Sequence, residues 1–182
     1  MKESTSRRLF LQKSAMATTG LALLSSGVAN AFSSEIPYHG YNPYSEEKTD
    51  LRTTIFEKHV RVKGTVYDKT GTTPLPNALV EVWHLSPDSS KYRHRTKLRT
   101  DHMGRYNFIT DFPNRETAQV SRIFFKLSHE GSSLFTELAV DQTGACVTSK
   151  HWEANQHLGE KLQPTSESFL QTTTINFNLS IY

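Results

Sequence analysis

Residues 60–109 decide the fold, and they read VRVKGTVYDKTGTTPLPNALVEVWHLSPDSSKYRHRTKLRTDHMGRYNFI. Apolar and polar residues alternate over residues 59–68. One face of this segment carries Val60, Val62, Gly64 and Val66. Side chains two positions apart share a face of a β-strand, so the alternation predicts a half-buried strand. Residues 69–77 hold one glycine and two prolines, which predict a turn because proline cannot donate to a strand ladder.

Further strands follow along the chain. Similar apolar patterns occupy residues 78–85, 105–110, 122–129, 133–140 and 172–181, and residues 53–56 are a candidate start of the sheet. Short strands separated by turn signals, with no long amphipathic helix, predict an all-β protein with an antiparallel β-sandwich. Six residues, Val80, Val82, Phe108, Phe125, Phe177 and Leu179, are predicted to fill its core. The polar stretch 141–171 is predicted to contain one short helix, around residues 151–162.

Three motifs lie within this region. They are G-x-V-x-D-x-x-G at residues 64–71, P-x-P-N-A-x-V-E-V-W at 74–83 and T-D-x-x-G-x-Y-x-F at 100–108. With them the chain resembles the core of the intradiol ring-cleavage dioxygenases, ferric enzymes that split catechols. The resemblance is strong over about 50 residues and weaker towards the C-terminus. It implies an antiparallel β-sandwich of the intradiol dioxygenase core type.

The resemblance also implies a ligand set that can be compared residue by residue. Family members hold ferric iron with two tyrosinates and a His-x-His pair. Tyr92 matches the first tyrosine, but the turn at residues 112–115 has no tyrosine for the second. The histidine positions fall on Arg122 and Phe124, and the family's substrate-side arginine falls on Gln119. Tyr92 is therefore the one metal ligand kept by the match.

Tyr92, Arg122 and Gln119 are the candidate ligand-pocket residues. Arg122 either holds an anionic ligand such as a carboxylate through a bidentate contact or forms an ion pair near a strand end. If Tyr92 binds no metal or ligand, we expect it to be a loop tyrosine that packs on Trp83 or the sheet. Glu81, on the same strand face as Trp83, is expected to be a partnered structural carboxylate, because an unpaired buried charge is costly.

Two other histidine groups are weaker candidates for a metal site. His84, His94 and His102 lack tight chelate spacing, so they are expected to be solvated or to cap backbone groups.

The other group is Cys146, His151 and His157, whose spacing matches no strong motif. Cys146 is the only cysteine, and we expect it to be buried rather than free to pair with a partner. No Ser-His-Asp order, phosphate-binding glycine loop or His-Glu-x-x-His motif occurs in the sequence.

The N-terminus has the pattern of an export signal. Residues 6–13 read SRRLFLQK, an uncharged stretch covers residues 14–28, and Ala29-Asn30-Ala31 follows. This order resembles a cleaved twin-arginine signal peptide and predicts a periplasmic or secreted protein. The alternative is an uncleaved anchor, but the apolar run is shorter than the roughly 20 residues that span a bilayer. The predicted domains are the signal at 1–31, an extended N-terminal arm at 32–58 and the sandwich at 59–182.

Removal of the signal changes the charge balance. The chain has 21 Lys and Arg against 18 Asp and Glu. The signal holds four of the basic residues and one of the acidic residues, so 17 of each remain in the mature chain. A neutral mature chain gives no electrostatic support for binding to nucleic acid or to an anionic membrane. We expect no nucleic-acid partner and no stable membrane insertion after cleavage.

These observations predict an exported intradiol dioxygenase-like protein that does not cleave rings. It would bind a small aromatic ligand or serve as the partner subunit of a homologous iron-bearing protein, with no cofactor of its own. One alternative is an active dioxygenase that cleaves catechol-type aromatics with a rearranged ferric iron site. Another is a periplasmic interaction module that keeps only the sandwich.

Overall fold

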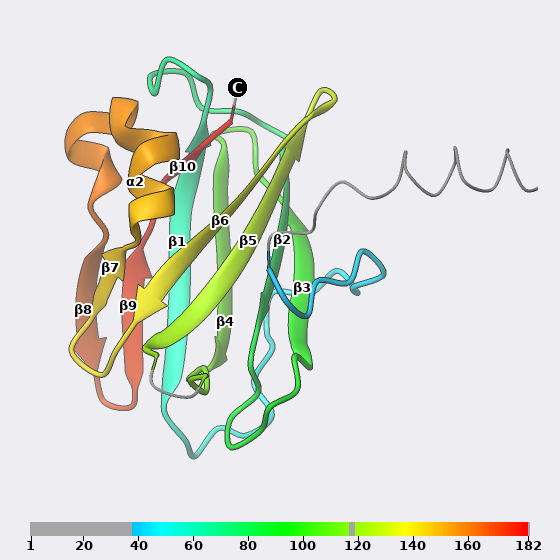
Figure 1. The fold of residues 1–182 in the computed structure, drawn as a ribbon, viewed down its shortest axis with the longest axis vertical. Coiled ribbons are helices and arrows are strands. Elements are labelled where there is room, and N and C mark those ends of the chain that lie inside the picture. The colour runs from blue at the N-terminus through cyan, green and yellow to red at the C-terminus, as the bar shows by residue number, and fades with distance from the viewer. Residues whose placement is uncertain (1–37, 117–118, 182) are drawn as a thin grey trace, which may run out of the picture. The chain divides into compact units, whose positions relative to one another are not determined.

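The computed structural model describes residues 38–116 and 119–181. The predicted signal peptide lies outside the described residues. Two sheets face each other in the described part (Figure 1). The first contains, in order, β10 (Leu179–Ser180), β1 (His59–Tyr67), β9 (Thr172–Asn176) and β8 (Thr165–Phe169), with β4 (Arg105–Asp111) also paired to β1. The second has the order β3 (His94–Arg99), β2 (Leu79–His84), β5 (Ser121–His129), β6 (Ser132–Val140) and β7 (Ala145–Val147).

The predicted all-β sandwich is confirmed, and one feature of its pairing differs from the prediction. β1 pairs antiparallel with β4 but parallel with both β9 and β10. Parallel neighbours need a long connection, and residues 68–171, which include all the strands from β2 to β8, separate β1 from β9. The strands predicted at 59–68, 78–85, 105–110, 122–129 and 133–140 are confirmed within two residues at each end.

The strand predicted at residues 172–181 is broken, so that prediction was wrong in its extent. Residues Phe177 and Asn178 separate β9 from β10. The Phe177 N–H still donates to Lys63 O at 2.8 Å. A Cβ at Gly64 would lie 1.8 Å from Phe177 O, so only glycine permits this close approach of two backbones.

Four further assignments differ from the sequence prediction. Residues 53–56 form no strand, and β3, β7 and β8 were not predicted. β3 reads HRTKLR and β8 reads TSESF, and neither shows the apolar alternation of a half-buried strand. All five β8 residues are exposed, as expected of an edge strand that buries neither face.

The core lies between the inner faces of the two sheets. The six predicted core residues are all confirmed, and none is more than 1% exposed. The inner face of β1 adds Val60, Val62 and Val66, as its alternation predicted. Phe125 and Phe177 pack with ring centroids 5.3 Å apart and join the two layers.

Helix α2 (Ser149–Asn155) and the 3-10 helix η1 (Gln156–Leu162) lie where a short helix was predicted. Thr148 caps α2 by accepting the His151 N–H. Asn155 Oδ1 accepts from Ser180 N and Oγ on β10 at 3.0 and 2.8 Å, while His151 Nδ1 lies 2.8 Å from Thr136 Oγ1 on β6. The helix therefore links the two sheets. No helix among the described residues is long and apolar enough to cross a membrane.

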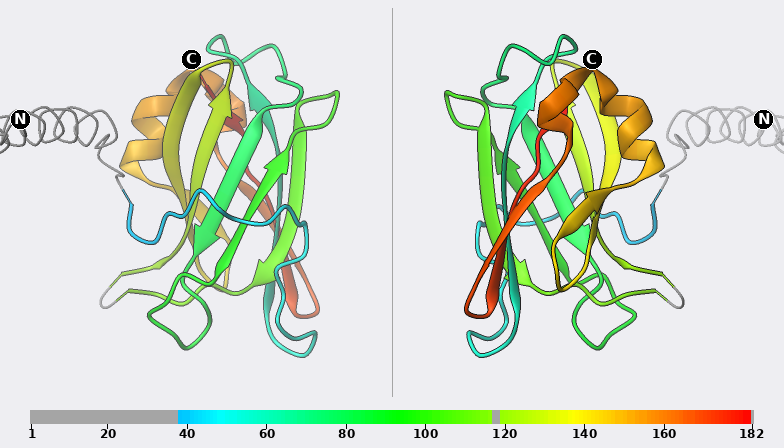
Figure 2. Two further views of the ribbon diagram at one scale, coloured as in Figure 1. Left: turned by 90° about the vertical axis from the view of Figure 1, so that its right-hand side faces the viewer. Right: turned by 90° about the vertical axis from the view of Figure 1, so that its left-hand side faces the viewer.

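The described part of the N-terminal arm, residues 38–58, packs on the sandwich. It runs between β3 and β4, where Lys97 N donates to Glu46 O at 3.1 Å and Ile109 N donates to Thr49 O at 2.8 Å. Before that point it crosses the outer face of the second sheet (Figure 2, left). The arm thus closes one open side of the sandwich and covers the face that carries the candidate site.

Candidate functional site

The candidate site lies on the outer face of the second sheet. Successive side chains of a strand point to opposite faces of the sheet. On β5 Phe125 points into the core, so Arg122, Phe124 and Lys126 point outward. Strand pairing brings side chains of β2 and β6 beside them. We call the following residues the outer-face cluster: Glu81, Trp83, Arg122, Phe124, Lys126, Phe135 and Glu137.

Aromatic residues of the arm cover this cluster. The Tyr38 ring packs on Phe124 with centroids 4.9 Å apart, and Tyr41 packs on Trp83 at 5.2 Å. The Trp83 indole N–H donates to His39 O at 2.9 Å. Trp83 and Phe124 are 2% and 7% exposed although they point away from the core. The arm therefore gives the protein a second, smaller apolar core.

An ion pair occupies the position that the sequence match assigns to the first histidine. Arg122 Nη1 donates to both carboxylate oxygens of Glu137, at 3.0 and 3.1 Å. The Glu137 side chain is 4% exposed, and Arg122 Nε is buried without a hydrogen-bond partner. Burial, together with the Glu137 charge, raises the pKa of Tyr38 to about 12. Arg122 was predicted either to hold an anionic ligand or to form an ion pair, and in the structure it forms the ion pair.

A second charged group fixes the arm above β2. Tyr41 Oη donates to Glu81 Oε1 at 3.1 Å and accepts from Lys126 Nζ at 2.8 Å, and Lys126 Nζ lies 3.4 Å from Glu81 Oε2. Burial opposes the charge on Lys126, but Tyr41 and Glu81 together still raise its pKa above the ordinary value. The expectation that Glu81 is a partnered structural carboxylate is confirmed.

Tyr92 lies at the border of the outer-face cluster. Its hydroxyl donates to Glu116 Oε1 at 2.5 Å, and its ring lies 6.1 Å from Phe124. Burial and this hydrogen bond to a carboxylate raise the pKa of Tyr92 well above the ordinary value for tyrosine. A tyrosinate ligand must lose its proton, and here the neighbouring carboxylate favours the neutral phenol.

The candidate pocket residues border two different hollows. Gln119 and Arg122 line a cavity of about 10 Å³ together with Phe124 and Glu116, which is room for no more than one water molecule. Tyr92 lines a separate open hollow of about 460 Å³, which also borders on Glu116. The three candidates are therefore neighbours, but they do not surround one ligand-sized space.

The residues at the positions that the sequence match assigns to the iron ligands do not fit ferric iron. One is an arginine paired with Glu137, one is a phenylalanine packed under Tyr38, and Tyr92 is bound to Glu116. Among residues 38–116 and 119–181, no group of three or more His, Cys, Asp or Glu side chains could hold a metal ion. No mechanistic step through iron follows from this arrangement.

The other candidate groups depart from their sequence predictions. His84 and His94 are buried, with ring centroids 4.9 Å apart, so neither is solvated. His84 bonds the Leu85 carbonyl, which agrees with the expected contact to a backbone group, whereas His94 bonds the side chains of Ser86 and Asp111. Cys146 is exposed on β7, and the expectation of burial was wrong. β7 pairs only with β6 at the sheet edge and leaves the thiol uncovered.

One polar cluster was missed from the sequence. Asp111, at the end of β4, is fully buried and accepts hydrogen bonds from Thr53 of the arm and from His94. His94 in turn contacts Ser86. β3, β4, the loop after β2 and the arm meet at this point. These segments are far apart in the chain, so no spacing along the sequence indicates the contact.

No family profile and no curated protein sequence matches the chain, but solved structures do. A dioxygenase domain of a dioxygenase carbohydrate-binding protein fusion from Streptomyces sp. SirexAA-E aligns with TM-score 0.59 and 19% identity, over 80% of this chain and 93% of that one. An intradiol ring-cleavage dioxygenase from Tetranychus urticae gives 0.59 and 14%, over 81% and 91%. A 3-chlorocatechol 1,2-dioxygenase from Rhodococcus opacus 1CP gives 0.55 and 18%, over 78% and 68%. The described part of the chain has the fold of the intradiol ring-cleavage dioxygenases.

Proposed function

We propose that this protein is an exported intradiol dioxygenase-like protein that does not cleave aromatic rings. The observation that carries the proposal is the content of the outer-face cluster. Arg122, paired with the buried Glu137, and Phe124 take the two family histidine positions, and Tyr38 of the arm packs directly over Phe124. A cation that is already paired and a hydrocarbon ring offer a metal no lone pair.

Metal analysis of the purified protein tests this proposal. Protein produced in iron-supplemented medium is expected to contain far less than one iron per chain, to lack the visible tyrosinate-to-iron absorption and to leave catechol unchanged. A coloured protein with near-stoichiometric iron, which loses both colour and metal in Tyr92→Phe, would overturn it. Tyr44→Phe is the matched control, because Tyr44 is 90% exposed and lies outside the cluster.

The hollow beside Tyr92 supports a binding role in place of catalysis. Its lining includes the phenol of Tyr92, the carboxylate of Glu116 and the Arg115 side chain, and about 460 Å³ lies within the range of small-molecule sites. We propose a small aromatic ligand there. Saturable binding of a hydroxybenzoate, weakened in Arg115→Ala and unchanged in Arg99→Ala at the far end of β3, is the expected calorimetric result. Absence of binding would leave the partner-subunit role, tested by co-purification with a homologous iron-bearing protein.

Export is the remaining part of the proposal, and the signal sequence supports it. The replacement of Arg7 and Arg8 by lysine keeps the charge but removes the twin-arginine pair. The double variant is expected to stay in the cytoplasm uncleaved, while the wild type is found in the periplasm with its N-terminus at or near Phe32. Normal periplasmic accumulation of the double variant contradicts the twin-arginine interpretation.

A further inference from the structure

A continuous chain of hydrogen bonds links Ser86, His94 and Asp111. Ser86 Oγ lies 2.9 Å from His94 Nδ1, and His94 Nε2 lies 3.0 Å from Asp111 Oδ2. The three residues come from different elements: the loop after β2, the first position of β3 and the last position of β4. Pairing of His84 with His94 at the end of the β2–β3 ladder fixes the distance between the serine loop and the imidazole.

The donors along this chain follow from Asp111. A carboxylate can only accept, so His94 Nε2 carries the proton that it donates to Oδ2. In the neutral ring Nδ1 is then an acceptor, and the Ser86 hydroxyl must donate to it. The second contact of Ser86 Oγ agrees with this assignment, because the Arg93 N–H donates to it at 3.2 Å.

Asp111 is held in its charged form. The Thr53 N–H and hydroxyl donate to Oδ2 at 2.9 and 2.6 Å. Burial opposes the charge, but the Thr53 and His94 contacts together keep the pKa of Asp111 below the ordinary value. The carboxylate therefore orients the His94 ring and fixes which ring nitrogen carries the proton, which is the task of the acid in a nucleophile–base–acid triad.

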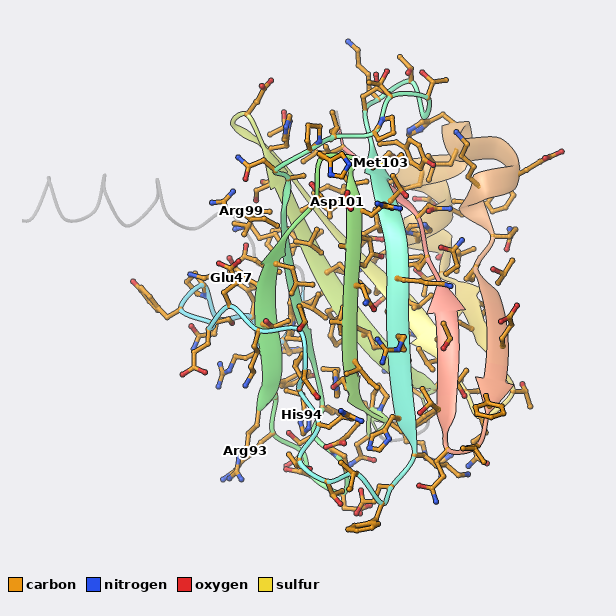
Figure 3. All side chains as sticks on the ribbon, turned by 180° about the vertical axis from the view of Figure 1, so that it is seen from behind. Glu47, Arg93, His94, Arg99, Asp101 and Met103 are labelled. Carbon is orange, nitrogen blue, oxygen red and sulfur yellow. The ribbon has the colours of Figure 1, made fainter. Side chains whose placement is uncertain are left out.

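The serine end of the chain opens on a hollow. Ser86 and His94 line a space of about 430 Å³, bounded by arm residues 48–53 and by Arg93. Figure 3 shows Arg93 and His94 at one end of β3, beside the arm. The wall carries both signs of charge. Lys48 and Arg93 form no ion pair among the described residues, and neither do Glu57 and Asp88, whereas Arg52 is paired with Asp50. Charges of both signs balance at this wall, so the hollow admits a small uncharged substrate such as an ester.

We propose that Ser86 is a nucleophile activated by His94 and Asp111, and that this hollow accepts small activated acyl esters. Ser86 Oγ attacks the acyl carbonyl carbon while its proton passes to His94 Nδ1. The resulting tetrahedral oxyanion collapses, the leaving alkoxide takes the proton from Nδ1, and an acyl-serine ester remains. Water then attacks that ester, loses its proton to Nδ1 and releases the acid, and the serine recovers its proton. The ring is used in the opposite sense from chymotrypsin-type triads, with the carboxylate on Nε2.

Covalent labelling tests the proposal without any need for a variant. The full mature protein is incubated with an alkyl fluorophosphonate, and the modified peptide is located by mass spectrometry. The expected result is one adduct, on Ser86. No adduct, or an adduct on another serine, overturns the proposal and leaves the three residues as a structural hydrogen-bond chain.

Variants then separate activation from simple access. His94→Gln is expected to lower the labelling rate by about 100-fold or more, the usual contribution of a general base, and Ser86→Ala to abolish the adduct. Ser133→Ala is the matched control, because Ser133 is an exposed serine on β6 outside this hollow, and it should label like the wild type. Unfolding curves show that each variant is folded. Undiminished labelling of a folded His94→Gln protein contradicts activation. Hydrolysis of p-nitrophenyl acetate should change in parallel, and it requires no iron.

Discussion

Two histidines are fully buried, and burial favours the neutral form of each. His84 Nδ1 donates to Leu85 O at 2.8 Å, so its Nε2 accepts from Thr110 Oγ1 at 2.7 Å. His151 contacts Thr136 and the Phe177 ring, and its Nε2 is buried without a partner. Burial lowers the pKa of His84 to about 3 and that of His151 to about 4.

These shifts predict loss of stability in mild acid. The unfolded chain takes up a proton at each imidazole as the pH falls through about 6.5, whereas the folded chain does not until far lower pH. Stability is therefore full above pH 6.5 and declines towards pH 4 to 3, by about 2 kcal/mol per imidazole between pH 7 and pH 5. Denaturant unfolding at the two pH values measures this difference. His151→Gln should remove about half of it, and His102→Gln, which changes an exposed side chain, should leave it unchanged.

The N-terminal arm is the element that distinguishes the outer face of the second sheet. It supplies aromatic cover for Trp83 and Phe124 and an acceptor for the indole N–H. It also passes so close to Tyr92 that a Cβ at Gly40 would lie 2.2 Å from Tyr92 Cγ. Gly40 has φ of +77°, so a side chain there meets both a strained backbone and an occupied space.

Gly40→Ala is expected to detach the arm from the sheet. Gly131→Ala is a close control, because Gly131 has φ of +85° and nothing within 4 Å of the added Cβ. Both variants carry the conformational cost of about 1–2 kcal/mol, and only Gly40→Ala adds the collision with Tyr92, worth roughly 1–3 kcal/mol more. Limited proteolysis should cut residues 38–58 faster in Gly40→Ala alone. Equal cleavage of both variants would mean that the arm does not depend on this contact.

Element by element, the sequence predicted the strands whose buried face is mostly apolar. It missed β8, because an edge strand with both faces exposed has no apolar period. It missed β3 for a related reason: the buried positions of HRTKLR include a histidine and a threonine, His94 and Thr96, whose polar atoms bond to the arm and to Asp111. A buried polar residue whose hydrogen-bond partners lie far away in the chain cannot be told from a solvent-exposed polar residue by the sequence alone.

At the scale of the whole molecule, Phe177 joins the layers of the sandwich. It lies between β9 and β10, contacts Phe125 of the opposite sheet and His151 of α2, and its carbonyl accepts the Tyr106 hydroxyl at 2.6 Å. The aromatic ring is completely buried. Three parts of the fold therefore depend on one side chain.

Phe177→Ala should cost about 3–5 kcal/mol of unfolding free energy, a large share of the stability of an ordinary domain. Chemical denaturation measures the loss. Phe169→Ala is the control of equal chemistry, because Phe169 is 78% exposed at the end of β8, and it should change stability by no more than about 0.5 kcal/mol. Similar effects of the two substitutions would show that the Phe177 position is peripheral.

The sequence by itself determined the β-sandwich and its buried faces, and it places Arg122 and Phe124 where the motif match assigns a His-x-His pair. These are local properties, readable from alternation, turn residues and motif spacing. Only the tertiary structure decided what surrounds the residues at those positions: the pairing of Arg122 with Glu137, the cover of Tyr38 and the binding of Tyr92 to Glu116. The same holds for Ser86, His94 and Asp111. Strand register and the path of the arm set the distances between residues far apart in the chain, and no period along the sequence encodes them.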